Sequence, residues 1–161
     1  MKRVKPLVAA WIFVACCALT GCRDSEAPVA ESPATTSLEK TYIDTHNGYS
    51  EAVVVVSGGL KTIFVSGQVG EGPDLDSQMR SALAKLVAVL GKAGAGMEDV
   101  VKMNTYIVDY GPETLGTFRG VRKELLGDSD MPASTLVGVE ALALPEWLIE
   151  IEAVAVIPAG E

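Results

Sequence analysis

The chain has 161 residues, 48% of them hydrophobic and 21% charged, with a formal net charge of −8 and a single histidine. This length suits about one domain, and the acidity argues against nucleic acid as a partner, because phosphate binding needs Lys and Arg side chains. One histidine argues against a histidine-based metal site or a Ser-His-Asp triad. The sequence contains no phosphate loop and no Gly-x-Gly-x-x-Gly after a strand, so we expect no cofactor and no metal.

The N-terminus has the pattern of a bacterial lipoprotein signal. Three basic residues within the first five positions precede an apolar run from Leu7 to Leu19, which is short for a membrane span. Residues 19–22, Leu-Thr-Gly-Cys, look like a lipobox, so we predict that residues 1–21 are removed and that Cys22 is lipidated. An ordinary secretory signal or an uncleaved anchor is the alternative. A diacylglyceryl group would supply the two chains that stable anchoring needs.

The predicted cleavage determines the charge, the cysteine content and the location of the mature protein. It removes three positive charges, which lowers the formal charge from −8 to −11, and it removes Cys16 and Cys17. Because Cys22 takes the lipid, the mature domain has no thiol for a disulfide or for nucleophilic catalysis. We expect a lipid-anchored protein of the bacterial cell envelope that faces the periplasm, with the choice of membrane left open.

Residues 23 to about 40 are rich in Pro, Ser, Thr, Ala and Glu and contain almost no bulky apolar side chains. Such a segment cannot bury enough surface to fold. We therefore predict a flexible tether over residues 22–40 and a folded domain over residues 41–161.

The domain opens with a predicted hairpin. After the Asn47-Gly48 turn, strands over residues 52–56 and 62–66 are joined by a Gly-Gly turn. The run of four valines at 53–56 does not alternate with polar residues, which indicates burial on both faces. A glycine-rich loop then leads to the first helix.

Two helices and an intervening strand follow. The first helix begins at Asp74 or Asp76 and ends near Lys92, and the second has Pro112 in its first turn and ends before Gly127. A strand over residues 100–108 lies between them. The apolar spacing predicts these inward-facing positions: Met79, Leu83, Leu86 and Leu90; Val101, Met103, Thr105 and Ile107; Leu115, Phe118, Val121 and Leu125.

The last predicted strands cover residues 132–139 and 147–153, joined through residues 144–146. In the second strand, Glu150 and Glu152 share one face while the residues between them share the other. The order of elements predicts an α+β domain in which two helices cover one face of the sheet. The other face must then be buried elsewhere, most simply against another copy of the chain.

The segment Pro132-Ala133-Ser134, an apolar strand and then Glu150-Ile151-Glu152 resembles the C-terminal signature of the Rid family. In this family, the reactive intermediate deaminases or YjgF-like proteins, the signature begins with Pro-Ala-Arg. The resemblance extends over residues 49–156, through Gly48-Tyr49, Val65-Ser66-Gly67-Gln68, the helix with Gln78 and Val100-Val101-Lys102. It implies a mixed sheet of the chorismate-mutase-like type and a homotrimer with small-molecule ligands in clefts between subunits.

The resemblance also implies chemistry. Rid enzymes hydrolyse 2-imino or enamine acids to 2-keto acids and ammonia, and an arginine grips the carboxylate in a bidentate pair. By motif, Glu150 matches the water-activating glutamate, and the archetypal arginine and a cleft cysteine are replaced by Ser134 and Leu136. The resemblance thus predicts Glu150 as catalytic and the following residues as substrate-binding: Tyr49, Ser66, Ser134, Thr135 and Leu136.

The missing arginine changes the expected substrate. Losing two charge-assisted hydrogen bonds should weaken carboxylate binding by about a hundredfold or more. The helical Arg80, Arg119 and Arg122 are most simply surface residues. We therefore expect hydrolysis of an imine, an enamine or a related compound that is not bound as a simple 2-imino acid, with a neutral ligand as one possibility.

Several alternatives remain open. The protein could be a non-catalytic small-molecule-binding or scaffold trimer of the envelope, or a purely structural one. Glu150 could be an ion-paired or edge carboxylate, Tyr49 a core aromatic and Ser66 a partner for backbone groups, while His46 is most simply a solvated loop residue. Ribonuclease activity, attributed to some relatives, fits poorly with an acidic domain that lacks a histidine pair.

Overall fold

The computed structural model describes residues 38–128 and 130–160, which belong to one compact unit running from Thr35 to Glu161. The predicted signal peptide, Cys22 and the tether up to residue 37 lie outside the described residues. Within the described ranges no helix has the length and apolar character needed to cross a membrane. The elements in chain order are β1 (Glu39–His46), β2 (Tyr49–Ser57), β3 (Leu60–Val69), α1 (Leu75–Lys92), η1 (Met97–Asp99), β4 (Val100–Val108), α2 (Pro112–Leu126), β5 (Ala133–Val139) and β6 (Ile149–Pro158).

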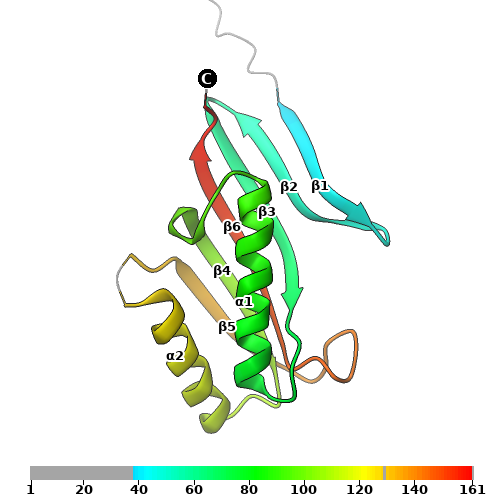
Figure 1. The fold of residues 1–161 in the computed structure, drawn as a ribbon, viewed down its shortest axis with the longest axis vertical. Helices are drawn as coiled ribbons and strands as arrows, with labels where there is room; N and C mark the ends of the chain where they lie inside the picture. Colours follow the sequence, from blue (N-terminus) through cyan, green and yellow to red (C-terminus); the bar gives the residue numbers. More distant parts are fainter. Residues whose placement is uncertain (1–37, 129, 161) are drawn as a thin grey trace, which may run out of the picture. The chain divides into compact units, whose positions relative to one another are not determined.

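The six strands form one mixed sheet in the order β1-β2-β3-β6-β4-β5, with both helices on the same face (Figure 1). Only β4 and β5 pair in parallel; every other neighbouring pair is antiparallel. Helix α1 connects β3 to β4, and α2 connects β4 to β5. The expected α+β fold, a mixed sheet with two helices on one face, is confirmed.

Helix α1 begins where its capping residue predicts. The Asp74 carboxylate accepts a hydrogen bond from the backbone N–H of Ser77 at 2.9 Å, and the Ser77 hydroxyl reaches back to the backbone of Asp74. The predicted stripe of the helix is buried against the sheet: Met79, Leu83, Leu86 and Leu90 are all at most 4% exposed. The stripe therefore places α1 over the centre of the sheet.

Beneath the helices lies one hydrophobic core. Strand register brings Val54, Ile63 and Ala155 side by side on this face, and Ile149, Ile151 and Ala153 continue it along β6. The alternate residues of each strand point to the opposite face of the sheet, away from the helices. There, the predicted burial of the 53–56 run is incomplete, because Val53 and Val55 are half-buried and only Val54 is buried in the single chain.

Two of the predicted inward positions are exposed, and a third, Leu115, is only partly buried and does not belong to the core. In β4 the register shifts between Val100 and Lys102, so Val100 turns inward at 6% exposure while Val101 is 49% exposed. In α2, Phe118 and Val121 are buried, but Leu125 is 45% exposed. Leu126 packs against the core in its place; it lies eight residues after Phe118, a spacing that falls on the same helix face as well as the seven-residue spacing of Leu125 does.

Strand β1 was not expected from the sequence. It begins at Glu39, inside the segment predicted as tether, and pairs with β2 from Glu39–Val56 to His46–Tyr49. Seven of its eight residues are exposed, and only Ile43 is partly buried. The strand exists because it completes the backbone hydrogen bonds of β2, and it therefore carries no hydrophobic alternation that sequence reading could detect.

Gln78 fastens the loop before β6 to the start of α1. Its side chain is 4% exposed; Nε2 donates to the carbonyl oxygens of Gly72 and Glu146 at 3.0 and 2.9 Å, and Oε1 accepts from the Leu148 N–H at 2.8 Å. Because Leu148 directly precedes β6, these three hydrogen bonds hold the start of the central strand in place beside α1.

Replacing Gln78 by Met should keep the volume but leave three backbone groups without partners. We expect a loss of about 2–4 kcal/mol in the free energy of unfolding, measured by urea titration. The exposed substitution Arg119→Met in α2 is the control and should change stability by less than about 0.5 kcal/mol. Equal stabilities of the two variants would show that water replaces the Gln78 contacts.

Candidate functional site

The two glutamates of β6 lie on the sheet face away from the helices. The residues between and beside them, Ile149 and Ile151, are fully buried in the core, so Glu150 and Glu152 project to the opposite side. In the ladder with β4, Glu150 is paired with Tyr106 and Glu152 with Asn104. The central strands thus place two carboxylates and two polar side chains together on an otherwise apolar face.

Glu152 has hydrogen-bond partners within the sheet. Asn104 Nδ2 donates to its Oε1 at 2.6 Å and the Tyr106 hydroxyl donates to the same oxygen at 3.1 Å. The hydrogen bond to Glu152 raises the pKa of Tyr106, and burial and the neighbouring carboxylates add to this. These contacts give Glu152 a structural role in holding β4 and β6 together.

Glu150 differs from Glu152 in having no side-chain hydrogen bond to any described residue. Burial raises its pKa above the ordinary value of 4.5, and the charge of Glu152 raises it further. Both effects favour the protonated form. A carboxyl group whose pKa is moved toward neutrality, with its lone pairs free, has the properties needed to accept and return a proton during a reaction.

A glycine makes room for this carboxyl group. Strand β3 is irregular between Val65 and Gln68, and a Cβ atom added to Gly67 would overlap Glu150 Oε1. Gly67 therefore lets the two strands keep the Glu150 side chain between them. A second tight glycine, Gly70, differs in that its added Cβ would overlap the backbone carbonyl of Gln78.

The two glycines provide a matched pair of substitutions. Gly67→Ala should push aside only the flexible Glu150 side chain, costing about 1 kcal/mol of stability, whereas Gly70→Ala must shift the first turn of α1 and should cost about 3 kcal/mol or more. Urea unfolding measures both. Equal losses would mean that Glu150 is not free to move.

Tyr49 and Ser66 lie at the end of the sheet near the β1–β2 turn. Tyr49 is the first residue of β2 and is 47% exposed, and its ring packs edge-on against His46 with centroids 4.7 Å apart. The Ser66 hydroxyl donates to the Ser50 carbonyl oxygen at 2.7 Å. Tyr49 is thus available to a ligand, while Ser66 already satisfies a backbone group.

A polar cavity of about 570 Å³ beside Tyr49 contains a network that sequence reasoning missed. Glu51 Oε1 lies 2.6 Å from His46 Nε2, and Glu51 Oε2 accepts from the Gln68 amide at 2.8 Å. The Gln68 hydrogen bond lowers the pKa of Glu51, and His46 adds to the effect. His46 is exposed, as expected, but it ends β1 rather than lying in a loop, and it contacts Glu51 and Tyr49. Gly67 also lines this cavity, together with Lys85 and Lys92 of α1, so the cavity opens on the helix side of the sheet and Glu150 is not among its lining residues.

The three candidate residues of β5 divide between the two faces of the sheet. Ser134 pairs with Met103 and Leu136 with Thr105, both buried beneath the helices, so these two residues face the helix side. Thr135 pairs with Asn104 and faces the Glu150 side, where Lys102 Nζ donates to its hydroxyl at 2.5 Å.

Within one chain the structure therefore brings together only part of the predicted site. It brings Glu150 against Gly67, whereas the Tyr49 cavity, Ser134 and Leu136 lie on the helix side of the sheet. Asn104 and Tyr106 were missed, although the polar residues at 102, 104 and 106 alternate with buried ones and this alternation was a detectable signal. No group of three or more His, Cys, Asp or Glu side chains suited to a metal ion occurs in the described ranges.

The six-stranded mixed sheet with a Glu-Ile-Glu strand at its centre and two helices on one face defines a Rid-like α+β domain. A family model described as Endoribonuclease L-PSP matches residues 39–157. The chain belongs to this family, together with proteins named Rid, YjgF and RutC.

Individual relatives agree with this assignment. The chain is 34% identical over 118 residues to a 2-iminobutanoate/2-iminopropanoate deaminase of Dermatophagoides farinae, covering 68% of this chain and 85% of the relative. It is 33% identical to the RutC family protein YjgH of Escherichia coli, covering 70% and 89%. The crystal structure of Rv2704 from Mycobacterium tuberculosis, a YjgF/YER057c/UK114 family member, superimposes with a TM-score of 0.63 at 33% identity, covering 74% of this chain and all of the other.

Proposed function

We propose that this protein hydrolyses an imine, an enamine or a related small carbonyl compound, with Glu150 as the group that moves the proton. The observation that carries this proposal is the Glu150 carboxyl group, which has a raised pKa and no side-chain hydrogen bond to any described residue. Some relatives are named as deaminases of reactive intermediates, which supports the reaction class. The acidic net charge of the chain opposes RNA binding, so the family's description as an endoribonuclease is not carried to it.

The proposed reaction adds water across a carbon–nitrogen double bond. Ionised Glu150 accepts a proton from water as its oxygen bonds to the imine carbon, and it then returns that proton to the nitrogen. Glu150 then takes the hydroxyl proton of this carbinolamine and passes it to the nitrogen, while the C–N bond breaks with its electron pair going to nitrogen; the products are a carbonyl compound and neutral ammonia. An enamine is first protonated on carbon to enter the same sequence. Each half of the cycle uses one protonation state of Glu150, which a pKa moved toward neutrality allows.

We propose that the substrate lacks the carboxylate of archetypal 2-imino acids. Ser134 supplies no positive charge where the Rid signature has arginine, and Leu136 makes its surroundings apolar. The two lysines of the Tyr49 cavity, Lys85 and Lys92, are already paired with Glu71 and Asp44, so they leave little attraction for a substrate carboxylate. A neutral imine therefore fits these side chains better than an acid.

Assembly into a homotrimer, typical of this family, is part of the proposal. The face that carries Glu150 also carries Phe64 and Val137, which are 48% and 41% exposed, beside half-buried valines. Burying such a surface against further copies is favourable. Because β5 is an edge strand, its residues Ser134, Thr135 and Leu136 are available to line a cleft with a neighbouring subunit. The predicted lipid anchor at Cys22 would place these clefts on the periplasmic side of a membrane.

The test is turnover of a panel of imines generated in place, comparing neutral imines with 2-iminobutanoate and recording ammonia release. We expect at least one neutral imine to be hydrolysed faster than 2-iminobutanoate. If no compound is turned over but some raise the melting temperature, the cleft binds without reacting, and the scaffold or binding-protein alternative is supported instead.

A further inference from the structure

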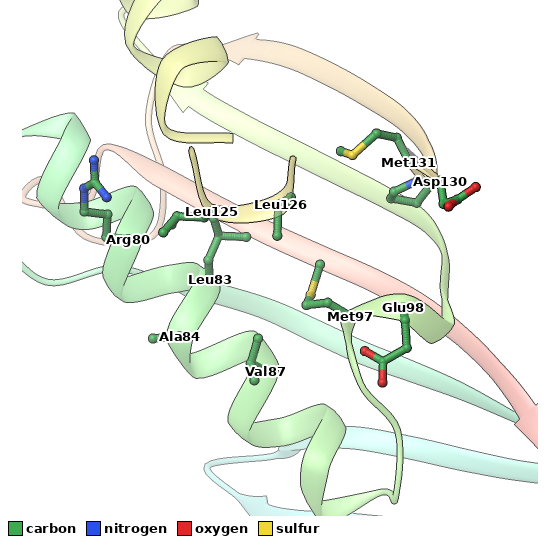
Figure 2. A pocket seen from close by; sticks show the side chains of 11 residues that line it. Arg80, Leu83, Ala84, Val87, Met97, Glu98, Leu125, Leu126, Asp130 and Met131 are labelled. Carbon is green, nitrogen blue, oxygen red and sulfur yellow. The ribbon is translucent and has the colours of Figure 1, made fainter. Parts of the chain in front are cut away.

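The two helices leave an apolar trough between them, on the side of the sheet opposite to Glu150. It has a volume of about 660 Å³ and is shown in Figure 2. Val87 of α1 and Leu125 of α2 are each 45% exposed in it. Its other large apolar side chains come from α1, α2, η1 and the segment before β5: Leu83, Leu126, Met97 and Met131. A concave apolar surface of this size is typical of small-molecule sites.

The positive charge at one end of the trough is already neutralised. Arg80 Nε donates to Asp76 Oδ1 at 2.8 Å, and its two terminal nitrogens donate to the Glu124 carboxylate at 2.8 and 2.7 Å. These hydrogen bonds link α1 to α2, and they use the guanidinium donors for two carboxylates. Arg80 therefore has no strong attraction left for an anionic ligand.

The opposite end of the trough is acidic. Glu98 of η1 and Asp130 line this end, away from Arg80 in Figure 2. Neither carboxylate takes part in any ion pair recorded for residues 38–128 and 130–160, whereas Arg80 is paired twice. The trough thus joins an apolar wall to two carboxylates that lack a cation.

We propose that the trough binds an amphipathic amine, with its hydrophobic body along Leu83, Leu126 and the two methionines and its ammonium group at the acidic end, which Glu98 and Asp130 line from separate positions. The apolar wall supplies the free energy of burial and the carboxylates supply the preference for a cation. This site is separate from the proposed hydrolytic site and does not depend on it.

The methionines make the proposal measurable in the full chain. With ¹³C-methyl methionine labelling, Met97 and Met131 report on the trough, while Met79 and Met103, which are 1% and 3% exposed in the core, are internal controls. The probes share one naphthalene body: 2-(2-naphthyl)ethylamine, 2-(2-naphthyl)ethanol and 2-naphthylacetate. We expect saturable shifts of the Met97 and Met131 methyl groups, with the amine binding roughly 3–10-fold more tightly than the alcohol and the acetate most weakly.

Variants separate the two parts of the proposal. The double substitution Glu98→Gln and Asp130→Asn should lower the affinity for the amine to that for the alcohol. Ala84→Trp places a large side chain at an exposed position on α1; it should fill the trough and abolish binding of both the amine and the alcohol. Glu113→Gln, on the exposed start of α2, is the control. Equal binding of all three probes would overturn the assignment of a cation. If the Met97 and Met131 methyl signals do not shift when the probes are added but do shift with protein concentration, the trough is a contact with a second copy of the chain and the ligand site is overturned.

Discussion

Glu150→Gln is expected to abolish imine hydrolysis while slightly raising thermal stability at neutral pH. The amide keeps the size of the side chain but cannot accept and return a proton, and loss of such a group lowers kcat by about 10²–10⁴-fold. Steady-state assays on the best neutral imine measure this. Glu146→Gln, in the exposed loop before β6, is the matched control and should retain full activity. Equal rates in wild type and Glu150→Gln would remove Glu150 from the mechanism.

The stability effect follows from the sign of the pKa shift. The folded state raises the pKa of Glu150, so at neutral pH the ionised carboxylate is less favourable in the folded protein than in the unfolded chain. That penalty fades as the pH falls through the raised pKa toward 4.5. The Gln variant should therefore melt about 1–3 °C higher at pH 7, with the difference disappearing near pH 4. A lower melting temperature at pH 7 would show that the carboxylate stabilises the fold.

Ser134→Arg is expected to convert the protein toward 2-imino acids. A guanidinium at this position can form a bidentate pair with a substrate carboxylate, and we expect kcat/KM for 2-iminobutanoate to rise about a hundredfold, with neutral imines unchanged or slower. Ser134 is exposed, so the larger side chain can be accommodated.

Ser134→Gln controls for side-chain length without charge and should leave the preference as it is. Because Ser134 and Glu150 lie on opposite faces of the sheet within one chain, a gain in Ser134→Arg would also indicate that the cleft is completed by a neighbouring subunit. No gain in either variant would mean that position 134 does not meet the substrate.

The fold was predictable because its apolar periodicities are strong, and the departures have local causes. Helix α1 carries its buried stripe where the spacing places it, but the irregularity at Val100–Lys102 exchanges the faces of Val100 and Val101, and no residue type marks such a shift in advance. Strand β1 has no apolar alternation because backbone pairing alone holds it to β2.

The candidate site was predictable in part, for a different reason. Glu150 was predicted because it matches the glutamate of the Rid signature, in a strand that is otherwise apolar apart from Glu152. Glu51 and Gln68 were missed because their contact joins two strands through side chains, which depends on tertiary register rather than on spacing along the chain. The facing of Ser134 likewise follows from its pairing with Met103, which the sequence does not specify.

The place of β6 in the sheet has a consequence for how the chain acquires its structure. This strand follows the other five in chain order, yet it lies between β3 and β4, which are not paired with each other. The two halves of the sheet therefore cannot pair until β6 has been synthesised, and a nascent chain without β6 lacks the central contacts of the sheet. Such long-range closure slows folding, and loss of β6 would leave β1-β2-β3 and β4-β5 as two groups of strands with no backbone pairing between them.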